Sequence, residues 1–121
     1  MAISRILVVD DSPTERFFLS ELLVKNGYLV SMAESGEEAV AQAKQTLSDL
    51  IVMDVVMPGM NGYQATRMIG KEDATKHIPV IMCTTKGQET DKVWGMRQGA
   101  KAYLVKPVKP EDLLSQIKAL D

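Results

Sequence analysis

The sequence has few of the features that mark secreted, membrane-spanning or nucleic-acid-binding proteins. Cys83 is the single cysteine, so no disulfide can form within the chain, and a reducing, cytoplasmic location is expected. No apolar run approaches the ~18 residues of a membrane-spanning helix, and the N-terminus lacks the apolar segment of a signal peptide. The 14 basic and 16 acidic residues are scattered, with a net charge of -2 and no basic stripe. Neither a membrane nor a nucleic acid is therefore an expected partner.

The length and composition fit one globular domain. Chains of this size bury roughly 65% of their unfolded surface, which is enough for a real core. Hydrophobic residues make up 45% of the 121 residues and charged residues 25%, as is ordinary for a globular protein. No linker or low-complexity segment separates a second domain, so we expect a single domain over residues 1–121 and no output domain.

Short apolar runs alternate with helical patterns along the whole chain. Five runs predict strands, at residues 5–9, 28–33, 50–53, 80–83 and 102–105. Most are continuously apolar, which is typical of strands covered on both faces. The alternation predicts an α/β fold with a parallel sheet and right-handed crossovers. We favour the flavodoxin-like (βα)5 topology, with strand order 2-1-3-4-5 and helices on both faces of the sheet.

Capping residues and apolar spacing place the helices between these strands. Ser12 with Glu15 and Ser35 with Glu38 have the spacing of capping boxes, and a proline follows Ser12 at the first helical position. The first helix is predicted to end at Asn26-Gly27, and its buried face to contain Phe17, Phe18, Leu19, Leu22 and Leu23. Further helices are predicted at about residues 62–69, at about 87–98 and from about Pro110 onward.

Polar side chains follow four of the five predicted strands. They are Asp10 and Asp11 after the first strand, Asp54 after the third, Thr84 and Thr85 after the fourth, and Lys106 after the fifth. Strand ends are often polar without any function. However, the carboxyl ends of parallel strands meet at one edge of the sheet, where ligands bind in such folds. Acids, a hydroxyl and an ammonium group converging there favour a functional site.

Three carboxylates in one crevice need a counter-ion. Two carboxylates about 4 Å apart repel each other by about 4 kcal/mol at an effective dielectric constant of 20. Mg²⁺ suits oxygen ligands and commonly joins one or two carboxylates to a phosphate. Lys106 adds a compact positive charge, and the Thr84 hydroxyl can donate to an anion. The set fits a phosphoryl-transfer site in which Asp54, after the central strand, is the nucleophile that becomes an aspartyl phosphate.

At these residues the sequence closely resembles the receiver domain of bacterial two-component response regulators, over essentially the whole chain. The segments VVDDS, VMDVVMPGMNGY, VIMCTT and YLVKP carry the resemblance, in this order and at receiver-like separations. Among receivers, a single-domain protein of the chemotaxis type is the most similar in kind. Residues 84–107 also resemble the receivers of type IV pilus twitching-motility systems.

The resemblance implies how the acids act. Asp54 takes a phosphoryl group from a histidine kinase. Asp11 and Asp54 ligate Mg²⁺ directly, Asp10 acts through a water molecule, and the backbone carbonyl of Val56 completes the protein ligands.

The resemblance also implies a switch. Thr84 moves toward the phosphoryl group, Lys106 contacts it, and Tyr103 changes rotamer together with Thr84. The face formed by the fourth helix, fifth strand and fifth helix, roughly residues 87–120, then binds a downstream motility or signalling protein, and the protein is expected to be a monomer. Val56 and Lys86 border the path of an attacking water. The apolar Val56 favours slow self-hydrolysis of the phosphate, whereas Lys86 leaves the direction open.

Other functions remain as alternatives to an effector that docks on a target. The protein can instead be a phosphate sink that drains a shared kinase, and the sequence does not separate these two roles. A Mg²⁺-dependent phosphatase with an aspartyl nucleophile typically carries a second acid two residues later, where Val56 stands, so a regulator that is not an enzyme is preferred. A flavin-binding protein of this topology would need a phosphate-cradling loop after the first strand, which the sequence lacks.

Three single residues have simpler expected roles. Cys83 reads as a small core residue and His77 as a solvated loop residue. Trp94, the single tryptophan, either packs in the core or contacts a partner.

Overall fold

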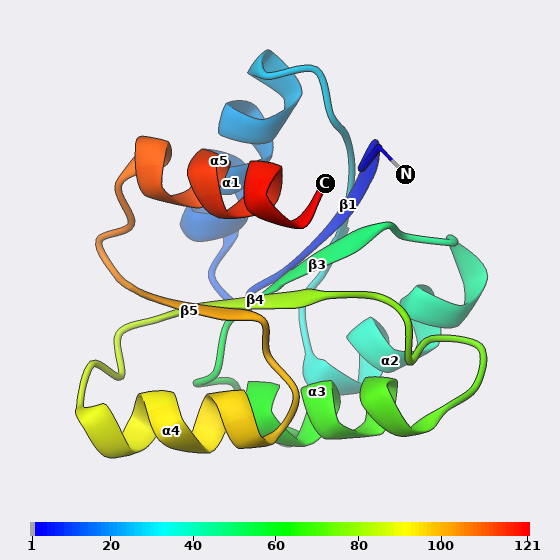
Figure 1. The fold of residues 1–121 in the computed structure, drawn as a ribbon, viewed down its shortest axis with the longest axis vertical. Coiled ribbons are helices and arrows are strands. Elements are labelled where there is room, and N and C mark those ends of the chain that lie inside the picture. The colour runs from blue at the N-terminus through cyan, green and yellow to red at the C-terminus, as the bar shows by residue number, and fades with distance from the viewer. Residues whose placement is uncertain (1) are drawn as a thin grey trace.

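Five parallel strands form one sheet of order β2-β1-β3-β4-β5 in the computed structural model, which describes residues 2–121. The elements are β1 (Arg5–Val9), α1 (Pro13–Lys25), β2 (Leu29–Ala33), α2 (Gly36–Gln45), β3 (Leu50–Met53), α3 (Gly62–Lys71), β4 (Val80–Thr84), α4 (Glu89–Arg97), β5 (Ala102–Val105) and α5 (Pro110–Leu120). Helices α1 and α5 cover one face of the sheet, and α2, α3 and α4 cover the other (Figure 1). The predicted flavodoxin-like fold is confirmed. No helix of the described residues is both long and apolar enough to cross a membrane.

The sheet separates two apolar layers, which explains the continuous apolar runs in its central strands. Every residue of β3 and β4 is buried. Leu7 and Ile51 belong to the layer beneath α2 and α3, whereas Ile6 and Val52 belong to the layer beneath α1 and α5. Successive side chains of a strand point to opposite faces, so a strand covered on both sides must be apolar throughout.

The buried face of α1 is narrower than the sequence predicts. Leu19 and Leu23 are buried and Leu22 packs against them, but Phe17 is 67% exposed and Phe18 is 44% exposed. Residues 19 and 23 lie one turn apart on the face toward the sheet, and 3.6 residues per turn carry positions 17 and 18 away from it. The prediction that Phe17 and Phe18 lie on the buried face was wrong. It relied on their apolar character and gave too little weight to the helical period.

The helix starts follow the predicted N-caps, with a difference in detail. The Ser12 and Ser35 hydroxyls each accept a hydrogen bond from the backbone N–H three residues later. In residues 2–121 the reciprocal glutamate bonds do not form, so neither is a complete capping box. A complete box forms instead between Asn61 and Gln64 at the start of α3, which fixes the entry into that helix close to Asp54.

Two strand boundaries differ slightly from the prediction. Thr84 is the last residue of β4 and does not follow it, and β2 begins at Leu29, one residue later than predicted.

Cys83 is buried and His77 is exposed, as expected. Trp94 is 48% exposed, so it is not a core residue.

Replacing Leu23 with alanine is expected to lower the free energy of unfolding by about 2–5 kcal/mol, because it leaves a cavity among fully buried neighbours. Phe17→Ser on the same helix should change it by no more than about 0.5 kcal/mol, because the side chain is exposed and the two residues have similar helix propensities. Urea unfolding of both variants tests this difference. An equal loss of stability in Phe17→Ser would show that the Phe17 side chain packs in the core.

Candidate functional site

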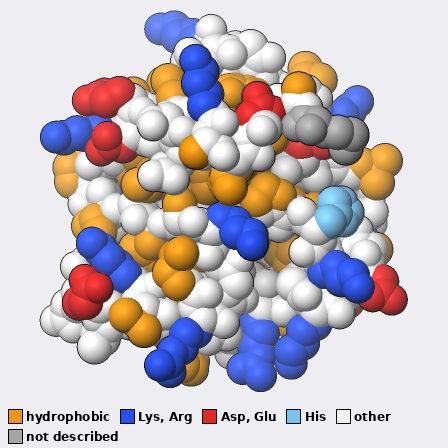
Figure 2. Space-filling model, viewed as in Figure 1, with side chains coloured by type: hydrophobic (Ala, Val, Ile, Leu, Met, Phe, Trp, Pro, Cys, Tyr) orange, Lys and Arg blue, Asp and Glu red, His pale blue; other side chains and the backbone are white. Residues whose placement is uncertain are grey.

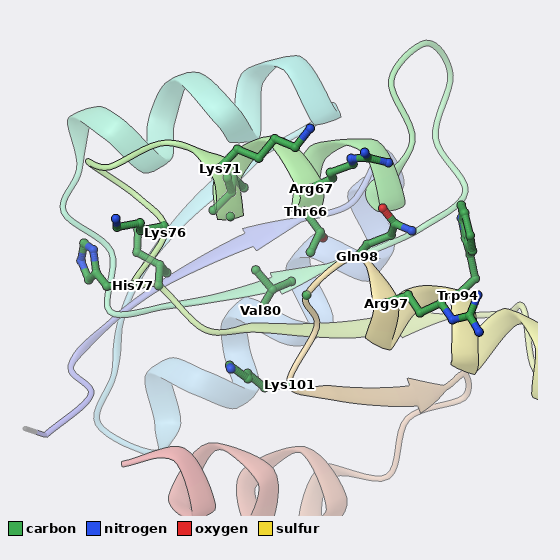
Figure 3. Close-up of a pocket in the computed structure, with 14 residues that line it drawn as sticks. Thr66, Arg67, Lys71, Lys76, His77, Val80, Trp94, Arg97, Gln98 and Lys101 are labelled. Atoms are coloured by element: carbon green, nitrogen blue, oxygen red, sulfur yellow. The ribbon is translucent and has the colours of Figure 1, made fainter.

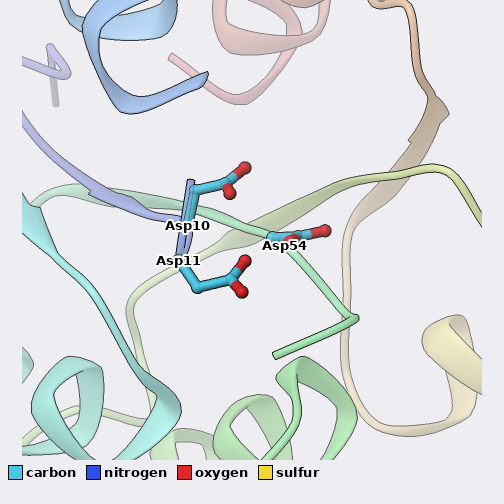
Figure 4. A group of neighbouring side chains, drawn as sticks. All are labelled: Asp10, Asp11 and Asp54. Carbon is cyan, nitrogen blue, oxygen red and sulfur yellow. The ribbon is translucent and has the colours of Figure 1, made fainter. Parts of the chain in front are cut away.

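Three carboxylates meet at the carboxyl edge of the sheet. Val9 pairs with Met53 in the register of β1 and β3, so the residues that follow them, Asp10 and Asp54, come out side by side. One oxygen of each of Asp10, Asp11 and Asp54 lies within 4.8 Å of the others, and the side chains project into a common space (Figure 4). Asp10 is 1% exposed and Asp54 is 6% exposed, whereas Asp11 is exposed.

Backbone N–H groups orient two of these carboxylates. The N–H of Val55 donates to Oδ1 of Asp54 at 2.9 Å, and the N–H of Ser12 donates to Oδ1 of Asp10 at 2.9 Å. The backbone of Asp54 is itself tied to β1, because its N–H donates to the Val9 carbonyl at 2.9 Å. Among residues 2–121, the hydrogen bond and the salt bridge to the Asp54 carboxylate both use Oδ1, which leaves Oδ2 for a ligand.

Lys106, directly after β5, brings a positive charge to the acids. Its Nζ lies 2.7 Å from Oδ2 of Asp10, 3.8 Å from Oδ1 of Asp54 and 3.9 Å from Oε2 of Glu15. Burial lowers the pKa of Lys106, but the hydrogen bond to Asp10 and the negative charges of Asp54 and Asp10 outweigh burial, so the pKa lies above its usual value. The lysine is thus protonated at neutral pH.

One lysine does not neutralise three carboxylates. Burial, and then the charge of Asp10, raise the pKa of Asp54 from 3.8 to about 6, although Lys106 and the Val55 N–H act in the opposite direction. The donor set consists of carboxylate oxygens alone, close together and partly open to solvent at Asp11. Such a set fits a hard divalent cation such as Mg²⁺, which would relieve the remaining repulsion.

The backbone of Lys86 joins Thr84 and Tyr103. The Thr84 side chain is fully buried, and its hydroxyl accepts a hydrogen bond from the Lys86 N–H at 3.3 Å. The Tyr103 hydroxyl donates to the Lys86 carbonyl at 2.7 Å and lies 3.4 Å from the hydroxyl of Tyr63. Burial, together with the hydrogen bond to Tyr63, raises the pKa of Tyr103. Neither this use of the Lys86 backbone nor Tyr63 had a signal in the sequence.

The two residues expected to affect phosphate lifetime each stand two positions after a site residue, Val56 after Asp54 and Lys86 after Thr84. Val56 stands between β3 and α3 with a side chain that is 54% exposed. The Nζ of Lys86 lies 3.7 Å from Oδ1 of Asp91 in the first turn of α4, so its side chain is drawn toward that helix.

Gly62 is a site residue that the sequence prediction treated only as the start of a helix. Its N–H donates to the Val55 carbonyl at 2.9 Å. A Cβ at this position would overlap the backbone carbonyl oxygen of Asp54 and lie 2.8 Å from the Cα of Val55. Helix α3 therefore starts in direct contact with the backbone that carries Asp54, and the glycine of the MNGY segment was the available signal.

Fold and site together define a receiver, and the chain belongs to the response regulator receiver domain family, whose model matches residues 6–118. It is 56% identical over 117 residues to Protein PilH of Pseudomonas aeruginosa, covering 97% of each chain. The resemblance found in the sequence is confirmed.

Solved structures agree with this assignment. The Vibrio cholerae chemotaxis protein CheY4 superposes with a TM-score of 0.91 at 36% identity, covering 99% of this chain and 100% of that one. The receiver domain of the sensor histidine kinase PA1611 from Pseudomonas aeruginosa superposes with a TM-score of 0.89 at 30% identity, covering 98% and 97%. That receiver domain has a magnesium ion coordinated in its active-site cleft.

Gly62→Ala is expected to lower the free energy of unfolding by about 1–3 kcal/mol, because the added methyl group overlaps the backbone at Asp54 and Val55. Gly70→Ala, near the other end of α3, is the matched control, because a Cβ there meets no atom within 4 Å. It should raise stability by up to about 1 kcal/mol through helix propensity. Chemical unfolding measures both, and a Gly62→Ala protein as stable as the wild type would show that α3 does not hold the Asp54 backbone.

Asp54→Asn is expected to stabilise the metal-free protein at pH 7.5 by about 3 kcal/mol, from a pKa that rises by roughly two units on folding. A raised acid pKa means that ionised Asp54 destabilises the folded state above about pH 6. The penalty shrinks as the pH falls through that value and is absent below about 3.8. The stability difference between variant and wild type should shrink in the same way.

Unfolding in a chelator from pH 4 to pH 8 gives this difference directly. Asp73→Asn is the control, since the side chain of Asp73 is 96% exposed, and it should show no comparable pH dependence. A stability difference that does not change with pH would mean that Asp54 is not destabilised by ionisation.

Proposed function

We propose that this protein is a phosphorylation-controlled response regulator in which Asp54 accepts a phosphoryl group from a histidine kinase in the cytoplasm. The observation that carries the proposal is the convergence of Asp10, Asp11 and Asp54 within 4.8 Å, with the Lys106 ammonium 2.7 Å from Asp10 and 3.8 Å from Asp54. Membership of the receiver family and the magnesium-bound PA1611 receiver domain support it.

The residues that would hold Mg²⁺ are Asp11 and Asp54, with Asp10 acting through water and the Val56 carbonyl completing the set. When bound, the ion supplies positive charge that neutralises the incoming phosphoryl oxygens.

The chain's own residues perform the transfer. The Val55 N–H and Lys106 approach Oδ1 of Asp54, so Oδ2 is the oxygen that attacks phosphorus. The new bond joins Oδ2 to phosphorus, and the bond between phosphorus and the kinase histidine breaks, leaving its electron pair on the imidazole nitrogen. Lys106, kept protonated by the acids, stabilises charge on the phosphoryl oxygens.

Phosphorylation then acts through Thr84 and Tyr103. The Thr84 hydroxyl uses an acceptor position for the Lys86 N–H, so its own proton is available for a phosphoryl oxygen. When Thr84 moves toward that oxygen, its hydrogen bond from the Lys86 N–H weakens. The Lys86 backbone, whose carbonyl accepts the hydrogen bond of Tyr103, is then held less firmly. The result is a population shift of the segment that leads into α4.

The surface of α4, β5 and α5 is the proposed output face. Val93, Trp94 and Met96 on α4 and Val105 on β5 are exposed apolar side chains, between 38% and 48% accessible, which suit a protein partner. The resemblance of residues 84–107 to pilus twitching-motility receivers supports a role in motility signalling, and the similarity to PilH agrees with it. A phosphate sink would need no target on this face. We expect a monomer.

Incubation with acetyl phosphate and Mg²⁺ should add one phosphoryl group to the intact mass of the wild-type protein. Asp54→Asn and a chelated sample should add none, because the first lacks the nucleophile and the second lacks the ion. Following the mass over time after donor removal gives the phosphate lifetime, which we expect to be minutes or longer because the apolar Val56 cannot orient a water. Phosphorylation of Asp54→Asn would refute the assignment, and a lifetime of seconds would refute the role given to Val56.

A further inference from the structure

A second concave region lies at the opposite edge of the sheet from the acids. It is a groove of about 760 Å³ between α3, the segment before β4 and the end of α4 (Figure 3). Val80, the first residue of β4, and Lys101, directly before β5, lie along it. Thr84 and Lys106 stand at the other ends of these strands, so the groove is separate from the proposed phosphoryl site.

The groove is strongly cationic. Its basic lining residues are Arg67, Lys71, Lys76, His77, Arg97 and Lys101, and no acid lines it among residues 2–121. Five of the 14 lysines and arginines of a chain with a net charge of -2 thus gather here. Basic side chains over α3 and the nearby end of α4 are visible along the lower part of the surface in Figure 2. Such a concentration attracts anions.

Most of these charges have no acidic partner. Lys76 pairs with Asp73 at 3.0 Å. For the other lysines and arginines of the groove, the described part of the chain places no carboxylate oxygen within 4.0 Å. The positive charge of these four side chains is therefore not neutralised by a salt bridge in the described residues.

The interior of the groove carries a second, independent signal. Thr66 lines it and is 2% exposed, yet its hydroxyl has no hydrogen-bond partner in the described structure. Buried polar groups without a partner destabilise a fold and are rare. Three buried apolar residues, Ile69, Ile78 and Val80, also line the groove. The groove therefore combines a largely basic lining with apolar side chains and one unpartnered hydroxyl.

One end of the groove offers an aromatic surface. Trp94 lies there beside Arg97, and its side chain is 48% exposed (Figure 3). The positions of Gly70 and Gly99 are open, because a Cβ at either would meet no atom within 4 Å. Exposed aromatic rings next to basic residues stack planar bases while the basic groups contact phosphates.

We propose that this groove binds a nucleotide. Its phosphates lie among the basic side chains and its base stacks on Trp94. A polar group of the nucleotide accepts a hydrogen bond from the Thr66 hydroxyl. The volume of about 760 Å³ is within the range of roughly 300–1,000 Å³ that is usual for small-molecule pockets. An acidic peptide would satisfy the charges, but it would leave the aromatic end and the enclosed hydroxyl unused.

The test uses the full chain and its single tryptophan. Titration of Trp94 fluorescence with ATP and with GTP, in a chelator so that the acid site holds no metal, should give a saturable change. Adenosine supplies only the base and pyrophosphate only the phosphates. Each should bind at least about tenfold more weakly than ATP. The variant Asp54→Asn should bind ATP as tightly as the wild type. Nucleotide binding is thereby tested independently of the proposed phosphorylation of Asp54.

Charge-reversal variants locate the binding. Arg67→Glu and Lys101→Glu should each weaken ATP binding by about tenfold or more, whereas Lys118→Glu, on the exposed last turn of α5, makes the same change in net charge and should leave it within about twofold. Thr66→Val keeps the side-chain volume and removes the unpartnered hydroxyl. It should be at least as stable as the wild type and bind ATP several times more weakly.

Three results would overturn the proposal. One is the absence of a saturable change at millimolar nucleotide. Another is an equal loss of affinity in Lys118→Glu, which would mean attraction to net charge alone. The third is tighter binding of a polyglutamate peptide than of ATP, which would assign the groove to an acidic segment of a protein.

Discussion

The ion pair between Lys106 and Asp10, 2.7 Å apart, is the contact on which the carboxyl edge of the sheet depends. Within residues 2–121, Lys106 is the side chain that forms salt bridges with the acids of the cluster. It connects the end of the last strand to the end of the first across β3 and β4, so the charge balance of the site couples strands that are not neighbours in the sheet. The balance is incomplete, because the pKa of Asp54 stays raised to about 6. A cation or a phosphoryl group changes that balance, and this makes the edge responsive to both.

Much of the fold follows from local pattern. The strands were predictable because burial on both faces forces continuous apolar runs. The strand order was a choice between the common doubly wound topologies, because right-handed crossovers are compatible with more than one of them. Phe17 and Phe18 were misplaced because their apolar character was given more weight than their positions in the helical period. The complete capping box of α3 was missed because Asn61 and Gln64 lie inside a turn-rich segment whose end is not fixed by periodicity.

The acids and Lys106 were predictable for a topological reason: each follows a strand, and parallel strands end at one edge. Side chains that act through the backbone were not. The Lys86 carbonyl and N–H bind Tyr103 and Thr84, but backbone groups are the same in every sequence. Gly62 was visible only as a turn residue, because its contact with the Asp54 carbonyl arises from how α3 packs beneath β3.

The cationic groove shows where charge patterning along a chain stops being informative. Its basic residues come from three segments, 67–71, 76–77 and 97–101, none of which is a run of like charge. The absence of a basic stripe in the sequence therefore does not exclude a basic surface in the fold. Folding brings α3 and the end of α4 together over the amino edge of β4, and among residues 2–121 no acid lines the groove that they form. Helix α4 thus borders both the proposed output face and the groove, with Trp94 exposed where the two surfaces meet.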